Sequence, residues 1–238
     1  MFERPHHRRI ERVLQLLRTA FLRQSGAYFG GGTSIALQIR EYRESVDVDF
    51  LCNDAEGYRN IHAAVFGAGY QGICLPEAVL AGELIRTRDA VRFFIDLQDG
   101  ERPVKCEIVR EGYLPPFQPG PAVAGVTALR PEDLMATKLL ANADRGLDRA
   151  LRFRDLFDLV MAGLEWPREA AVAMVKATQA YGESAKSALE KVTDLLREQP
   201  ELRLEAYERL AISMEARKVI DEVVAGSPRG TVSKIFGG

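Results

Sequence analysis

The chain lacks long hydrophobic runs. No apolar stretch among its 238 residues reaches the roughly 18 residues that a membrane-spanning helix requires. The first residues, MFERPHHRRIERV, also lack the apolar core of a secretory signal. We therefore expect a cytoplasmic protein with no membrane partner.

Cysteine and histidine are scarce. The three cysteines, Cys52, Cys74 and Cys106, are far apart and form no C-x-x-C pair, and the three histidines match no metal-binding spacing. This argues against a disulfide framework and against a zinc site. It predicts reduced thiols that act as small apolar core residues, and histidines that lie on the surface.

The chain has little net charge of either sign. With 32 basic and 34 acidic side chains, its formal charge is −2, so no global basic field surrounds it. Any binding of nucleic acid must rest on a local patch of basic side chains. The 47% of hydrophobic residues is typical of a globular protein with a sizeable core.

The periodicity of apolar residues divides the chain into two halves. It predicts a helix over 8–24, a strand over 27–29, a helix over 34–40, a strand over 46–52, a helix over 58–66, and a hairpin formed by 82–97 and 103–110. From Pro131 to about residue 224 the pattern is helical, with breaks at residues 146, 163–167, 182 and 200, and a loose tail follows residue 225. We predict an α+β domain over residues 1–129 and a helical domain over residues 130–238.

The segment Gly30–Phe50 combines a glycine-rich turn with two closely spaced acids. Asp47 and Asp49 alternate with apolar residues, beginning with Val46, so both carboxylates face one side of the predicted strand, with α-carbons roughly 6–7 Å apart. Acids this close repel each other unless a divalent cation lies between them, and their hard oxygen atoms suit Mg²⁺. The glycines let backbone N–H groups approach a phosphate at the start of the next helix. The segment predicts a nucleotide-handling site.

Four segments of the chain resemble motifs of one enzyme family. FGGGTSIALQIR (29–40), YRESVDVDF (42–50), LRPEDLMATKLLANADR (129–145) and RFRDLFDLV (152–160) resemble the AbiEii/AbiGii-type nucleotidyltransferase toxins of the DNA polymerase beta-like superfamily. The resemblance implies a polymerase beta-type mixed sheet with flanking helices, followed by a helical half that completes the active-site cleft. It also implies transfer of a nucleoside monophosphate from an NTP to an acceptor, with Mg²⁺ or Mn²⁺ as cofactor and pyrophosphate as leaving group.

The resemblance also implies roles for residues of the first half. Asp47 and Asp49 would be catalytic and would hold the metal ions, which stabilise charge on the reacting phosphates. Backbone N–H groups and hydroxyls of the glycine-rich turn and of the R-x-S-x-D-x-D pattern would bind the nucleotide: Gly31, Gly32, Thr33, Ser34, Arg43 and Ser45.

Enzymes of this fold often use a third metal-binding carboxylate on a neighbouring strand. Our candidate is Glu107, which alternates with core-facing residues of the sequence VKCEIV, and Asp96 is its rival. The usual residue is aspartate, so Glu107 departs from the pattern. For both acids the alternative is a solvated side chain of the hairpin.

Lys138 lies among apolar residues of the helix predicted to begin at Pro131. By itself such a lysine usually extends its amine to solvent. The resemblance instead implies a catalytic contact with phosphate.

Arg145 shares a helix face with Lys138, and Arg149 and Arg152 continue this stripe if Gly146 does not break the helix. A basic stripe would hold a triphosphate or an RNA backbone. The alternative is an exposed charged face paired with nearby aspartates.

Asp155 and Asp158 are three residues apart and share one face of a predicted helix. The resemblance implies that Asp155 is a catalytic or metal-orienting acid and that Asp158 lies at the nucleotide site. The alternative is a surface ion pair between Arg154 and Asp158.

Three functions remain open at this level. The first is a nucleotidyltransferase toxin of a bacterial toxin–antitoxin or phage-defence system, with an NTP as substrate, tRNA, another RNA or a protein as acceptor, and an antitoxin as partner. The second is a small-molecule nucleotidyltransferase of the antibiotic-resistance type. The third is a binding scaffold without turnover, against which the intact Asp47, Asp49 and Thr33 argue, and for which the departure at Glu107 argues mildly.

Overall fold

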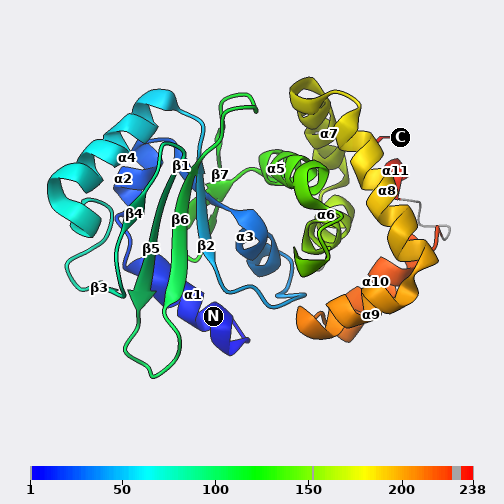
Figure 1. The fold of residues 1–238 in the computed structure, drawn as a ribbon, viewed down its shortest axis with the longest axis horizontal. Coiled ribbons are helices and arrows are strands. Elements are labelled where there is room, and N and C mark those ends of the chain that lie inside the picture. Colours follow the sequence, from blue (N-terminus) through cyan, green and yellow to red (C-terminus); the bar gives the residue numbers. More distant parts are fainter. Residues whose placement is uncertain (1, 152, 227–231, 238) are drawn as a thin grey trace. The chain divides into compact units, whose positions relative to one another are not determined.

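The structure is a computed structural model that describes residues 2–151, 153–226 and 232–237. The chain divides into two compact units, and Figure 1 labels most of their helices and strands. The first unit comprises Met1–Leu37 and Ser45–Arg130, and the second comprises Gln38–Glu44 and Pro131–Gly238. A short segment from the first half of the chain thus belongs to the helical unit.

A mixed β-sheet organises the first unit. The described residues contain eight strands: β1 (Ala27–Gly30), β2 (Val48–Cys52), β3 (Val79–Leu80), β4 (Ile85–Arg86), β5 (Ala90–Asp96), β6 (Val104–Arg110), β7 (Pro119–Val123) and β8 (Val126–Leu129). Their order is β3-β5-β6-β2-β1-β8-β7, and β4 also pairs with β5. β2 lies parallel to β6 and antiparallel to β1. The antiparallel pairing of β5 with β6 confirms the predicted hairpin.

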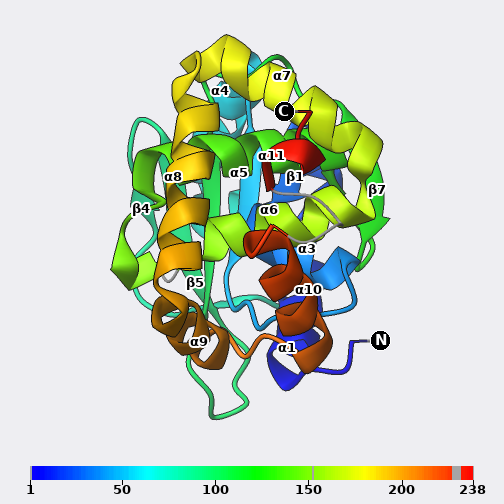
Figure 2. The same cartoon turned by 90° about the vertical axis from the view of Figure 1, so that its right-hand side faces the viewer.

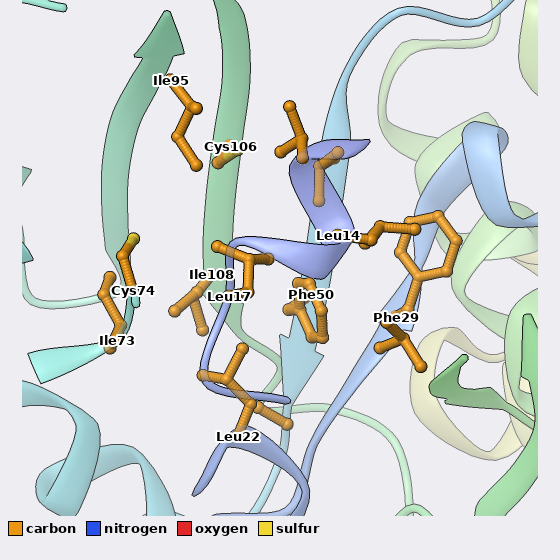
Figure 3. Packing of buried hydrophobic residues seen from close by; sticks show 14 of the residues in the cluster. Leu14, Leu17, Leu22, Phe29, Phe50, Ile73, Cys74, Ile95, Cys106 and Ile108 are labelled. Carbon is orange, nitrogen blue, oxygen red and sulfur yellow. The ribbon is translucent and has the colours of Figure 1, made fainter. Parts of the chain in front are cut away.

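Apolar side chains on one face of this sheet form the core with three helices: α1 (Pro5–Gln15), α2 (Thr19–Gln24) and α4 (Ala55–Ala68). Alternate residues of β2 and β6, among them Phe50 and Ile108, are buried here, as period-two patterning requires. Figure 3 shows Leu14 and Leu17 among these side chains. All three cysteines are free and buried, which confirms their predicted role as apolar core residues.

The single helix predicted over 8–24 is wrong, because two helices occupy this stretch. Between α1 and α2 the backbone turns away to hydrogen bond with residues 73–75. Arg18 N–H donates to the carbonyl of Ile73 (2.8 Å), and the carbonyl of Leu16 accepts from Leu75 N–H (2.8 Å). Apolar periodicity continues through the break, so it gave no sign of these distant partners.

The predicted strand 46–52 is too long at its start. β2 begins at Val48, and Val46 is 47% exposed instead of facing the core. β1 ends at Gly30, which pairs with Asp49, so the antiparallel ladder does not extend to residue 47. Asp47 therefore lies in the loop that precedes the strand.

Helices build the second unit: α5 (Pro131–Arg145), α6 (Arg154–Glu165), α7 (Pro167–Tyr181), α8 (Ser184–Glu198), α9 (Pro200–Arg209), α10 (Met214–Val224) and α11 (Val232–Ile235). α5 packs against α6, α7 and α8, and α10 contacts α6 and α8, as Figure 2 shows from the side of these helices. The remaining described elements of the whole chain are helix α3 (Gly31–Gln38) and two 3₁₀ turns, Gly69–Gly72 and Arg149–Leu151. In the described part of the chain no helix combines the length and apolarity needed to cross a bilayer.

Two features of the helical unit differ from prediction. The expected loose tail contains α11, whose Val232 and neighbouring Phe236 are buried, while residues 227–231 and 238 lie outside the described residues. A Cβ on Gly163 would lie 2.3 Å from Ile235 Cγ2, so that glycine permits the close approach of α11. A further break separates α9 from α10, where Ala211 adopts a left-handed φ of 46° and Ser213 caps α10.

Candidate active site

The carboxylate of Asp49 lies directly against Gly31, the first residue of α3. A Cβ at position 31 would lie 3.0 Å from Asp49 Cβ and 2.5 Å from Asp49 Oδ2, and real Cβ atoms essentially never make a contact as short as the second. Gly31 also has a φ of +67°, which favours glycine. The glycine-rich turn therefore serves two needs: it starts α3 and it leaves space for an acid at the helix N-terminus.

Thr33 fixes the backbone around Asp47. Its Oγ1 lies 2.5 Å from the Asp47 carbonyl oxygen, to which it donates, and 2.7 Å from Ser45 Oγ. Thr33 is 1% exposed and Ser34 is fully buried, so both hydroxyls are enclosed by protein. The hydroxyl predicted to bind triphosphate is thus engaged in bracing the acid-bearing loop, and its contact with nucleotide stays a prediction.

His7 of α1 supports the same loop. Its Nε2 accepts a hydrogen bond from Ser45 N–H (3.2 Å), which requires that this nitrogen carry no proton. The imidazole is fully buried, so the expectation of a surface histidine is wrong here. The sequence gives no local signal for this contact, because the two residues are 38 positions apart.

Glu107 lies beside Asp49 on the neighbouring strand, since the two residues are register partners in the parallel pairing of β2 with β6. Its carboxylate is paired with Arg92 Nη2 (2.6 Å) and Lys105 Nζ (2.7 Å). Burial opposes ionisation, but these two cations outweigh it and lower the pKa of Glu107. Its location suits a third carboxylate, whereas its two basic partners already balance its charge.

Asp96, the rival of Glu107, lies on β5, which β6 separates from β2. Its Oδ1 accepts from Gln98 N–H (2.8 Å) in the turn that follows β5. Sheet order and register thus bring Glu107, and not Asp96, next to Asp49.

The oxygen donors of this unit suit a hard divalent cation. Within residues 2–151, 153–226 and 232–237, no group of three or more His, Cys, Asp or Glu side chains is arranged to hold a metal by itself. Mg²⁺ is commonly held by one or two carboxylates together with substrate phosphates. Because Gly31 has no Cβ, Asp49 Oδ2 can lie at the start of α3, where backbone N–H groups also favour a phosphate. The donor set fits a cation that shares its coordination with a bound triphosphate.

The helical unit contains a second charged cluster, centred on Asp158. This carboxylate is fully buried and makes a two-pronged pair with Arg43, through Nε (2.8 Å) and Nη2 (3.0 Å). Tyr42 donates a short hydrogen bond to Asp158 Oδ1, and Lys138 Nζ lies 2.7 Å from Oδ2. Although burial opposes ionisation, Arg43 and Lys138 lower the pKa of Asp158.

Asp155 extends this cluster towards the surface. Lys138 Nζ lies 2.6 Å from its Oδ1, and Arg145 Nε lies 3.0 Å from its Oδ2. Burial again opposes ionisation, but Lys138 and Arg145 hold the pKa of Asp155 well below its usual range. Three cations, Arg43, Lys138 and Arg145, therefore face two carboxylates; Arg43 and Lys138 are buried, whereas the side chain of Arg145 is 40% exposed.

Helix geometry explains how α5 and α6 form this cluster. Lys138 and Arg145 are two turns apart on one face of α5, and Asp155 and Asp158 are one turn apart on α6. Lys138 is only 5% exposed, so its amine ends at carboxylates and not in solvent. The alternative of a solvent-extended lysine is wrong for this reason.

Two expectations for nearby arginines are also wrong. α5 ends at Arg145, and Arg149 lies in a separate 3₁₀ turn, so no continuous helical stripe forms, while Arg152 lies outside the described residues. Asp158 pairs with Arg43 and Lys138 inside the unit, so it forms no surface pair with Arg154.

Comparison with solved structures defines the class of fold. The chain is similar to a crystal structure from H. pylori described as that of a candidate nucleotidyltransferase, with a TM-score of 0.56, 17% identity, and coverage of 97% of this chain and 93% of that chain. It is similar also to JHP933 from Helicobacter pylori, with a TM-score of 0.58, 15% identity, and coverage of 99% and 94%. At such identities the likeness establishes the fold. It confirms the predicted α+β nucleotidyltransferase fold with its helical C-terminal half.

The family follows from the sequence as a whole. Residues 14–225 match the family described as "Nucleotidyl transferase AbiEii toxin, Type IV TA system". The chain therefore belongs to the AbiEii nucleotidyltransferase toxins, and the suspected family is confirmed. No curated protein gives a match.

Proposed function

We propose that this protein transfers a nucleoside monophosphate from an NTP to an RNA acceptor, releasing pyrophosphate, with Mg²⁺ or Mn²⁺ bound during turnover. The observation that carries the proposal is the placement of Asp49 against Gly31 at the start of α3, beside the loop that holds Asp47. This puts acidic oxygen atoms next to backbone N–H groups that can receive a phosphate. Membership of a nucleotidyltransferase family supports the same reading.

In the sheet unit, Asp47 and Asp49 would hold the cation, and N–H groups at Gly31 and Gly32 would bind the triphosphate. The cation would neutralise charge on the phosphate oxygens and acidify the attacking hydroxyl. Thr33 keeps Asp47 in place through its carbonyl group, and this preorganised backbone reduces the rearrangement needed for reaction. Glu107 would bind the cation together with Asp49 only after it exchanges Arg92 or Lys105 for that cation.

In the helical unit, Lys138 and Arg145 would supply positive charge to the nucleotide phosphates. Asp155 and Asp158 position these cations, because each carboxylate binds Lys138 and Asp155 also binds Arg145. The side chain of Arg145 is 40% exposed, so its guanidinium can contact an anionic ligand. We assign Asp155 this positioning role in place of direct contact with a metal.

RNA, and tRNA in particular, is our proposed acceptor, and growth inhibition is the proposed outcome. The family belongs to type IV toxin–antitoxin systems, so a cognate antitoxin is its expected counterpart. Membership of this family favours a toxin over an antibiotic-modifying enzyme. We propose that the protein acts in the bacterial cytoplasm and that phage defence is one of its biological roles. Expression of the wild-type chain should slow bacterial growth, and the Asp49→Asn variant should not.

The acceptor is tested by incubating the purified protein with Mg²⁺, total bacterial RNA and each of the four NTPs, radiolabelled on the α-phosphate. Label in a tRNA-sized band, absent with Asp49→Asn, is the expected result. Label confined to the protein or to a small molecule would overturn the RNA acceptor. No transfer to any acceptor would overturn the proposed reaction.

A further inference from the structure

A cavity of about 420 Å³ lies within the helical unit, between the end of α5 and α8. This volume falls in the range of roughly 300–1,000 Å³ that small-molecule sites occupy. Its wall includes the charged residues Asp144, Arg145, Asp148 and Lys191 together with Asn142, Leu147 and Val192. It therefore combines aliphatic side chains with charged groups of both signs and with the carboxamide of Asn142.

Asn142 is the unusual member of this wall. The residue is 2% exposed, and among the described residues neither its Nδ2 nor its Oδ1 has a hydrogen-bond partner. A buried carboxamide without partners is costly, because it loses its bonds to water and gains none from protein. Buried polar groups in folded proteins nearly always have a hydrogen-bond partner, so a molecule from outside the chain is expected to complete the hydrogen bonds of Asn142.

The glycine that follows one turn later packs against this side chain. A Cβ on Gly146 would lie 2.7 Å from Asn142 Oδ1 and 2.8 Å from Val192 Cγ2. A larger residue at position 146 would therefore displace the side chains of Asn142 and Val192 from their present positions. Leu147, which is 58% exposed, adds an apolar surface beside it.

We propose that this cavity is a nucleobase site, in which the Asn142 carboxamide pairs with a donor–acceptor edge of the base. A carboxamide presents one acceptor and two donors in a plane, which matches the adjacent donor and acceptor on a base edge. The aliphatic residues Leu147 and Val192 contact the flat face of the base. This inference rests on the proposed function in taking a nucleotide as the ligand.

Arg145 connects the cavity with the charged cluster. It lines the cavity and also pairs with Asp155. A base in the cavity would place its own phosphates near a guanidinium that Asp155 already orients. The base belongs either to the incoming NTP or to the terminal nucleotide of the acceptor, and these sources are separable by experiment.

The test uses Asn142→Leu, which keeps the volume of the side chain and removes both polar groups. The control is Thr193→Val, another change from a buried polar residue to an apolar one of the same shape, at a residue that does not line the cavity. Binding is measured by calorimetry for non-hydrolysable analogues of the four NTPs, for short RNAs with each 3′-terminal base, and for inorganic triphosphate. Binding needs no turnover, so the result is independent of whether transfer is observed.

We expect Asn142→Leu to weaken binding of at least one base-bearing ligand by about 10-fold or more, the value of a two-bond base contact. Triphosphate should bind equally to the wild-type protein and to both variants, and Thr193→Val should match the wild type throughout. Loss in the NTP arm assigns the cavity to the substrate, and loss in the RNA arm assigns it to the acceptor. Equal binding of every ligand by Asn142→Leu and wild type, or binding of none by wild type, overturns the site.

Discussion

Asp49 Oδ2 lies 2.5 Å from the point that a Cβ on Gly31 would occupy. Asp49 lies on β2, and Gly31 follows directly after the neighbouring antiparallel strand β1, whose last residue, Gly30, pairs with Asp49. The glycine requirement of the motif is therefore set by the carboxylate as well as by the helix start.

Gly31→Ala should lower kcat/KM for transfer by about 100-fold or more, because the new methyl group displaces the Asp49 carboxylate by roughly an ångström. The control is Gly67→Ala in α4, where no atom lies within 4 Å of the added Cβ. Steady-state kinetics at saturating Mg²⁺ provide the measurement. Wild-type kinetics for Gly31→Ala would show that the position of Asp49 does not matter for catalysis.

Asp158→Asn should destabilise the fold by about 3–5 kcal/mol, because it removes the carboxylate that pairs with both of the buried cations Arg43 and Lys138. Both charges are almost completely removed from solvent, at 3% and 5% exposure. Urea denaturation gives the free energy of unfolding. Asp194→Asn, which changes an exposed pair on α8, is the control and should cost well under 1 kcal/mol. Equal effects of the two substitutions would contradict a buried, coupled network.

Stability should decrease in mild acid. The pKa values of Asp155 and Asp158 are both lowered in the folded protein, so the unfolded chain binds more protons as pH falls below its carboxyl pKa of about 4. The contribution of the pair is therefore complete above that value and is lost progressively below it. Urea titrations between pH 7 and pH 3 should show this slope in the wild type and a shallower one in Asp155→Asn. Parallel curves would indicate that Asp155 has the same pKa in both states.

His7→Leu should lower kcat with little change in the KM for NTP, because Ser45 N–H loses its acceptor and the loop bearing Asp47 loosens. His7→Gln offers an amide oxygen near the position of Nε2 and should restore part of the activity. A thermal melt accompanies the kinetics, so that general destabilisation is recognised. If both variants lose stability while kcat stays unchanged, His7 has only a packing role.

Local patterns predicted most of the elements. Alternating apolar residues in β5 and β6 defined the hairpin, and proline or glycine at the ends of α7 and α8 marked their limits. These signals are local, since period and breakers lie within one element. The same patterns failed at residues 16–18 and at α11, where distant backbone or side-chain partners decide the conformation.

The candidate site was only partly predictable for the same reason. Spacing predicted that Asp47 and Asp49 share one strand face, but only Asp49 lies on β2, whereas helix periodicity correctly placed Lys138 on one face with Arg145. The partner of Arg43 is Asp158, 115 positions away, and no local pattern contains that distance. The sequence also cannot predict that the Asn142 carboxamide lacks hydrogen-bond partners among the described residues, because this depends on which side chains the fold brings near it.

The most direct test of the account is label transfer to RNA by the wild type, Asp47→Asn and Asp49→Asn, each with and without Mg²⁺. Asparagine keeps the shape of aspartate and removes its charge, so the fold should persist, as circular dichroism can verify. We predict transfer by the wild type with Mg²⁺ alone, and a loss of at least about 1,000-fold in either variant, as expected when a metal-binding charge is removed. Transfer near the wild-type rate by either variant would contradict the assignment of these two aspartates as the catalytic acid pair.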